Sequence, residues 1–168
     1  MQRGALATLP RRRPWVGLAA SIPGVELVGA SGSVFTAQGL GAWYDGLAKP
    51  GVAPPNWVFA PVWTTLFAML GVAVFVVWRQ APTRPRRVRR ALAVFGAQFL
   101  LNLGWSAVFF GARSIGGGLL VITGLWVAIV ATIVAFDRVD RRAAVLVVPY
   151  LAWVSFAAYL NYRFLVLN

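Results

Sequence analysis

The side chains of this sequence that could do chemistry are mostly indole rings. Its 168 residues include eight Trp but no Cys and no His. Without His and Cys, Ser-His-Asp and Cys-His catalysis are excluded and the usual ligands of zinc and haem are missing. We therefore expect no metal site and no obligatory cofactor. Aromatic rings, side-chain amides and a few isolated charges remain as candidates for function.

Rings and amides recur at helical spacing in three apolar stretches. Phe59, Trp63 and Phe67 follow one another every four residues. Two further stripes consist of Gln98, Asn102, Trp105 and Phe109 and of Trp153, Ala157 and Leu160. Amides are costly against lipid, so Gln98 and Asn102 should face a bundle interior. Inward rings leave slots that suit a flat apolar ligand, although interhelical packing or an interfacial belt is the alternative for any single ring.

Five apolar stretches are long enough to position these side chains across a membrane. A helix needs about 20 mostly apolar residues to cross the hydrocarbon core. The stretches cover residues 14–36, 55–78, 91–112, 115–136 and 143–166. Hydrophobic residues make up 60% of the chain, and the runs lack the alternation of a membrane barrel. The sequence predicts an all-α integral membrane bundle of five transmembrane helices, forming one domain over residues 1–168.

The long connection between the first two stretches is rich in glycine and proline. Residues 37–54 contain six such residues, which should break any regular element. A loop of this length on a small bundle is a candidate lid over a ligand site.

The basic residues are strongly biased to one side of the predicted bundle. Thirteen of the sixteen lie in the N-terminal tail and in the second and fourth connections; Lys49, Arg113 and Arg163 lie on the other side. Basic loops favour the cytoplasmic side of a membrane. We therefore expect a protein of the cell membrane whose N-terminus is cytoplasmic. The net charge of +12 then predicts contact with anionic membrane lipids rather than nucleic acid. A signal peptide stays an alternative for the first stretch, because Arg11 to Arg13 precede its apolar run.

Motifs in the second half of the lid and beyond resemble one known family. Residues 43–50 read WYDGLAKP, residues 54–59 read PPNWVF and residues 61–63 read PVW. This order resembles the signature of the TspO/MBR family, and matching motifs follow over residues 97–106 and 149–161. The similarity runs from Trp43 to the C-terminus. Val52 stands where the family usually has Trp, which puts one loop contact to ligand in doubt.

The resemblance implies a ligand class and a set of pocket residues. TspO proteins bind tetrapyrroles, with porphyrin or haem as candidate ligands here, and also sterol-like molecules. A receptor or carrier linked to transport or stress sensing is therefore expected. On the matching positions the ligand-binding residues would be Tyr44, Pro54, Trp63, Phe67, Asn102, Trp105, Trp153, Ala157 and Leu160, with Trp43 and Trp126 in addition.

Other functions stay open at this point. The resemblance also implies a light- and oxygen-dependent porphyrin-degrading enzyme, with Trp43 and Trp153 as catalytic electron donors. A third hypothesis is a proton-coupled exporter, for which Glu26 inside the first stretch is the supporting residue. Lys49, Arg113 or Arg163 could pair with a propionate or extend to lipid headgroups.

The third stretch and the last one carry two weaker patterns. Small residues spaced by four, Ala93 with Ala97 and Ala107 with Gly111, predict a homodimer through the third helix. Val154, Tyr159 and Arg163 fit a short pattern proposed for sterol contact.

Overall fold

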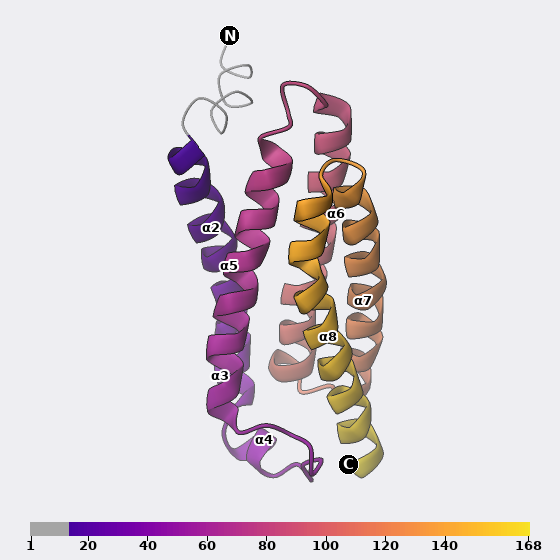
Figure 1. Ribbon diagram of the computed structural model, residues 1–168. Helices are drawn as coiled ribbons and strands as arrows, with labels where there is room; N and C mark the ends of the chain where they lie inside the picture. Colours follow the sequence, from indigo (N-terminus) through magenta and orange to yellow (C-terminus); the bar gives the residue numbers. More distant parts are fainter. Residues whose placement is uncertain (1–13) are drawn as a thin grey trace.

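The computed structural model describes residues 14–168, so Arg3 and Arg11 to Arg13 of the basic tail lie outside the described residues. Within this range the chain is helical and forms no strand. The elements are α2 (Pro14–Ser31), α3 (Ser33–Gly39), α4 (Ala42–Asp45), η1 (Asn56–Val58), α5 (Phe59–Trp78), α6 (Pro85–Ser106), η2 (Ala107–Gly111), α7 (Ile115–Asp137) and α8 (Arg141–Leu167), as labelled in Figure 1. The short element η1 is a 3-10 helix, and η2 is a π-helical continuation of α6.

Five helical stretches of the described chain are long and apolar enough to cross a membrane. They cover Pro14–Gly39, Asn56–Trp78, Pro85–Gly111, Ile115–Asp137 and Arg141–Leu167. The predicted all-α membrane bundle is thereby confirmed. The third span begins at Pro85 rather than near Ala91, because proline suits the first turn of a helix and arginines carry that helix beyond the apolar run.

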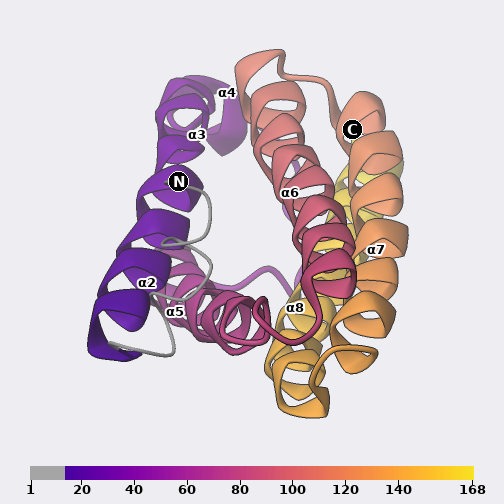
Figure 2. The same cartoon turned by 90° about the horizontal axis from the view of Figure 1, so that it is seen from above.

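The five spans form a ring when the bundle is seen along its axis. In Figure 2, α2, α5, α8, α7 and α6 follow one another around the interior. The α2 and α5 backbones are close, since a Cβ added to Gly71 would lie 2.6 Å from the Ile22 Cα. By contrast, α2 touches α6 only slightly, whereas α6, α7 and α8 pack closely together. α2 and α6 thus make the least contact around the ring, whereas the same two spans meet more closely at the lid end, through α3 and η2.

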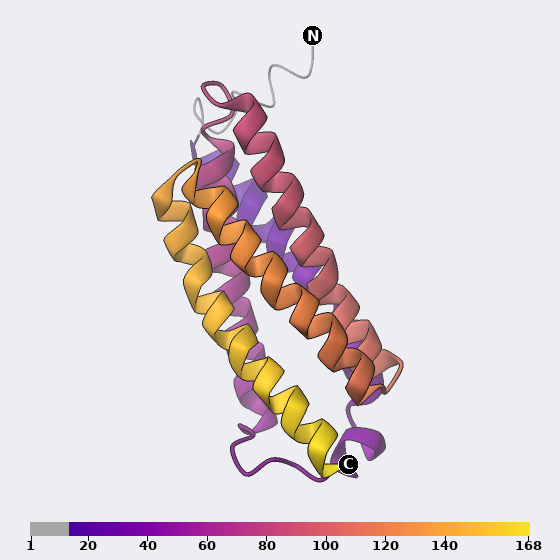
Figure 3. The same ribbon diagram turned by 90° about the vertical axis from the view of Figure 1, so that its right-hand side faces the viewer.

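The connection between the first two spans lies across one end of the bundle, beside the C-terminus (Figure 3). Our expectation that residues 37–54 contain no regular element was wrong, because α3 continues to Gly39 and α4 forms a short helix. Gly41 has a φ of 107°, a value that glycine adopts easily, and the chain turns sharply there. The Asn168 side chain fixes the far end of this lid by donating to the Ala48 carbonyl and accepting from its amide, at 3.2 and 2.9 Å.

The half of the bundle away from the lid is filled by a hydrophobic core. Its largest fully buried side chains come from α5, α7 and α8 and include Leu70, Val77, Ile129, Phe136 and Val147. Phe95 of α6 stacks on Phe99 and on Phe136, with ring centroids 5.4 and 5.9 Å apart. This packed half holds the spans in place, and room for a small molecule occurs in the other half.

Candidate functional site

A cavity of about 300 Å³ lies in the lid half of the bundle. Its lining comes from α2, α3, α4, η1, α5, α6, η2 and α8. Phe67 closes its inner end, where this ring meets Phe99 edge to face at 5.5 Å. Among the described residues that line the cavity, none carries a charge. The site is therefore an apolar chamber inside the membrane bundle.

The structure brings most of the predicted ligand-binding residues to this one cavity. Those that line it are Tyr44, Trp63, Phe67, Asn102, Trp105, Ala157 and Leu160. They come from α4, α5, α6 and α8, which are far apart in the sequence. The side chains predicted to share a pocket therefore do converge on one hollow.

Four predicted ligand-binding residues do not line the cavity: Trp153, Trp126, Pro54 and Trp43. Trp153 packs edge to face on Phe59, at 5.9 Å, and covers the seam between α5 and α8. Trp126 lies on the outer side of α7 and donates from Nε1 to Ser155 Oγ at 2.8 Å. Pro54 lies in the lid connection before η1. Helical spacing puts Trp153 on the same side of α8 as Ala157, but it could not show that the ring packs against Phe59 of α5.

An aromatic wall is built around the π-helix η2. Trp105 stacks on Phe109 at 5.6 Å, and Phe109 contacts Phe110 at 4.8 Å. Consecutive rings of this element, Phe109 and Phe110, both line the cavity. Sequence reasoning missed Phe110, because the stripe of Gln98, Asn102, Trp105 and Phe109 steps by three or four residues and passes over it. The lid reaches this wall through Trp43, whose ring lies 5.8 Å from Phe109 without lining the cavity.

The first span contributes small side chains that sequence reasoning also missed. Gly29, Ala30, Gly32 and Ser33 line the cavity opposite the aromatic wall. A Cβ on Gly29 would lie 2.4 Å from the Phe67 ring, so this glycine leaves the space that the ring occupies. The run of small residues in an otherwise apolar span was the signal that could have identified this wall.

Two buried hydrogen-bond groups fix the polar side chains beside the cavity. Tyr150 Oη donates to Gln98 Oε1 at 3.2 Å and accepts from Asn102 Nδ2 at 3.0 Å. Asn161 Oδ1 accepts from Trp105 Nε1 at 3.1 Å, while its Nδ2 donates to the Ile115 carbonyl at 2.8 Å. Gln98 and Asn102 are both buried, which confirms that these amides face the interior. Because the Trp105 N–H already has a partner, Trp105 offers a ligand its ring face.

Several polar atoms of the lining remain available to a ligand. Within residues 14–168, Trp63 Nε1, Asn102 Oδ1, Tyr44 Oη, Ser106 Oγ and the Asn56 side-chain amide form no hydrogen bond. They include both donors and acceptors. The cavity can therefore orient a mainly apolar molecule that carries a small number of polar groups.

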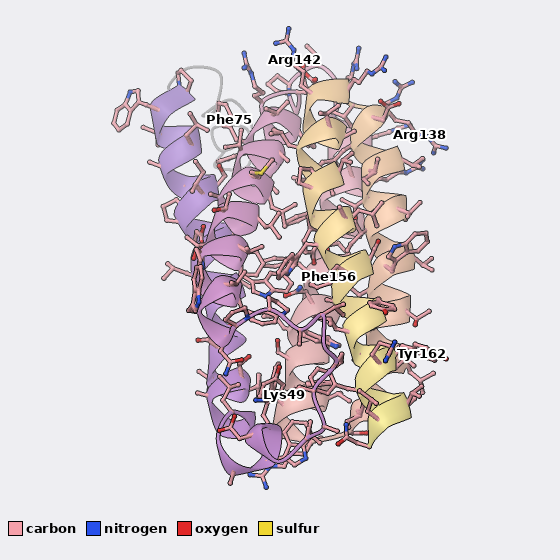
Figure 4. The ribbon with its side chains drawn as sticks, turned by 60° about the horizontal axis from the view of Figure 1, so that its bottom comes forward. Lys49, Phe75, Arg138, Arg142, Phe156 and Tyr162 are labelled. Carbon is pink, nitrogen blue, oxygen red and sulfur yellow. The ribbon has the colours of Figure 1, made fainter. Side chains whose placement is uncertain are left out.

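Charge lies outside the cavity, at the lid. Lys49 Nζ is 3.3 Å from Asp45 Oδ1 and 4.9 Å from the centre of the Tyr44 ring (Figure 4). Burial raises the pKa of the Tyr44 phenol above its ordinary value, and the Asp45 carboxylate raises it further. Arg113 and Arg163 do not line the cavity. Lys49 is thus the cation that contacts a cavity-lining ring.

Glu26 does not line the cavity either. It lies in α2, one turn from the lining residues Gly29 and Ala30, and is partly buried. Within residues 14–168, no three side chains among His, Cys, Asp and Glu lie close enough to hold a metal ion.

These features define an integral membrane protein of five helices with an aromatic cavity under a lid. The sequence model of the TspO/MBR family matches residues 21–167, and the chain belongs to that family. A tryptophan-rich protein TspO of Chlorobaculum tepidum is 47% identical over 145 residues, covering 84% of this chain and 89% of its own. The tryptophan-rich sensory protein of Cereibacter sphaeroides is 38% identical, covering 75% and 77%. The human translocator protein is 40% identical, covering 71% and 72%.

Proposed function

We propose that this protein is a membrane receptor or carrier that binds tetrapyrroles, and also sterol-like hydrophobic molecules, in the aromatic cavity. The observation that carries the proposal is the convergence of rings from α4, α5, α6 and η2 on one uncharged chamber. Flat apolar ligands gain from such walls, because ring faces supply contact area with little conformational entropy to lose. The names of the relatives, translocator and sensory protein, support a link to transport or stress sensing.

The cavity must widen to hold a whole tetrapyrrole. Its volume of about 300 Å³ is at the lower end of the range for small-molecule sites. The seam between α2 and α6 is the side that can yield, because these helices make little contact, and widening at the lid end would also have to loosen the contact between α3 and η2. A smaller sterol-like or bicyclic molecule needs less movement.

The acidic groups of a porphyrin should project toward the lid. No charged side chain lines the cavity in the described part of the chain, so a buried propionate would have no counter-ion there. Lys49 lies over the Tyr44 ring at the lid and could exchange its Asp45 partner for a propionate. Pairing at this position leaves the macrocycle among the rings.

We also place the N-terminus on the cytoplasmic side of the cell membrane. Arginines of the connections before α6 and α8 gather at the end opposite the lid, where Figure 4 shows Arg138 and Arg142. Such residues favour the cytoplasm, so the lid would face the outside. A homodimer through α6 stays part of the proposal, because Ala93 and Ala97 are exposed. Gly111 of the second small-residue pair is instead contacted by Phe35.

The test is a titration of the protein with protoporphyrin, followed by quenching of Trp fluorescence. Ala157 is buried and lines the cavity, whereas Ala152 is exposed on the same helix. Overpacking typically costs about 1–3 kcal/mol, so Ala157→Phe should weaken binding roughly five- to 150-fold. Ala152→Phe should leave the affinity unchanged. Equal affinities for both variants would contradict the proposed site.

The photodegrading enzyme gains no support from the site. Trp43 and Trp153, the expected electron donors, both lie outside the cavity lining. We therefore propose binding as the function.

A further inference from the structure

The end of the bundle opposite the lid carries a concentrated positive charge that the proposed ligand site does not use. Nine arginines of the described chain lie in or beside the connections at this end, against two acids, Asp137 and Asp140. The arginines are Arg79, Arg84, Arg86, Arg87, Arg89, Arg90, Arg138, Arg141 and Arg142. Here they are called the arginine face.

Two arginines join the separate basic segments into one surface. Arg84 Nη1 donates to the Val139 carbonyl at 2.7 Å, and Arg87 Nη1 donates to the Arg138 carbonyl at 3.4 Å. These bonds hold the start of α6 against the turn between α7 and α8. These bonds also keep like charges from two connections close together, and the repulsion between those charges is unfavourable.

Within the described chain much of this charge is not neutralised. The guanidinium groups of Arg86, Arg90 and Arg138 are exposed and form no ion pair with a carboxylate of residues 14–168. Asp140 is already engaged, because it accepts from the Arg142 amide at 3.0 Å and from Gln80 Nε2 at 3.4 Å. Asp140 caps α8, but the first turn of α6 carries arginines, no acid and no side-chain cap, although a helix N-terminus disfavours cations. An anion bound from outside the chain would neutralise the unpaired arginines and would stabilise the helix N-terminus.

The position of the arginine face points to an anionic phospholipid as that anion. Trp15 at the start of α2 is 67% exposed, as expected of a ring at headgroup depth. Below Arg138 and Arg142, the outer sides of α7 and α8 expose Val134, Val145 and Val148, which offer an apolar wall to acyl chains. Figure 4 shows Arg138 and Arg142 pointing away from the bundle at this end. We infer that the arginine face is a docking site for anionic phospholipid headgroups, held through their phosphates.

Native mass spectrometry in micelles that contain phosphatidylglycerol or phosphatidylcholine tests this site. Each arginine near an anionic surface contributes about 1 kcal/mol, so Arg90→Gln should weaken phosphatidylglycerol binding about fivefold and Arg90→Gln/Arg138→Gln about 25-fold. Arg113→Gln is the matched control, because Arg113 is exposed at the lid end. It should change nothing. Helix content by circular dichroism checks that each variant is folded.

Three results would overturn the inference. One is equal retention of phosphatidylcholine and phosphatidylglycerol by the unmodified protein. Another is a loss in Arg113→Gln as large as that in Arg90→Gln, which would mean a general effect of net charge. The third is displacement of the lipid by inorganic phosphate or by a short DNA duplex at the same ionic strength, which would assign the site to another phosphate-bearing partner.

Discussion

The buried hydroxyl of Tyr150 should hold α6 and α8 together beneath the cavity. In Tyr150→Phe, Asn102 Nδ2 and Gln98 Oε1 both lose their partner, and Gln98 Nε2 has none within the described residues. Hydrogen bonds between membrane helices contribute about 0.6 kcal/mol on average and up to about 1.7. Loss of two such bonds should therefore lower the free energy of unfolding by about 1–3 kcal/mol.

The assay is reversible unfolding in mixed micelles, titrated with a denaturing detergent. Tyr159→Phe is the matched control, because Tyr159 is exposed on the same helix and makes no side-chain hydrogen bond within residues 14–168. A double-mutant cycle with Gln98→Leu isolates one bond. The double variant should lose less than the sum of the single losses, because each single change already removes the Tyr150 to Gln98 contact.

Two outcomes would refute this reasoning. If Tyr150→Phe and Tyr159→Phe have the same stability, the buried hydroxyl does not contribute. If the losses in the cycle add within about 0.3 kcal/mol, Tyr150 and Gln98 are not coupled.

Two further predictions concern the lid. A Cβ on Gly39 would lie 2.7 Å from the Phe110 backbone, so Gly39→Ala should cost about 1–3 kcal/mol of stability. Gly96→Ala should instead add about 0.5–1 kcal/mol of stability, because nothing lies within 4 Å of a Cβ built at Gly96. Melting temperatures equal to that of the unmodified protein would contradict both predictions. The folded lid keeps the Tyr44 phenol protonated where the unfolded chain has lost the proton, so stability should fall as the pH rises above 10.0. Tyr44→Phe should flatten this fall in thermal melts, and an unchanged slope would count against burial of the phenol.

The fold could be predicted from the sequence because each span is a long apolar run that lipid requires to be helical. The interior direction of α6 was also readable, since Gln98 and Asn102 are too costly to face lipid. Features set by tertiary packing were not readable. The place of Phe110 in the wall and the rotation of the Trp153 ring toward Phe59 depend on neighbours that no local pattern specifies.

The lid is a second region whose structure could not be predicted from its sequence. Glycine and proline mark residues 37–54 as a connection, but α4 forms there nonetheless. Tyr44 is buried against Phe164 and Phe110, with ring centroids 5.6 and 6.0 Å away. These contacts come from α8 and η2, so they could not be inferred from the composition of the loop.

The central claim is that the chamber among the helices is where the ligand binds. The most direct measurement is a cryo-EM or crystal structure of the protein with protoporphyrin bound in a lipid environment. We predict macrocycle density between Trp63, Phe67 and Ala157, with its acidic groups toward Lys49 and with α2 moved away from α6. Density on the lipid-facing surface, with the chamber unchanged and closed, would contradict the account.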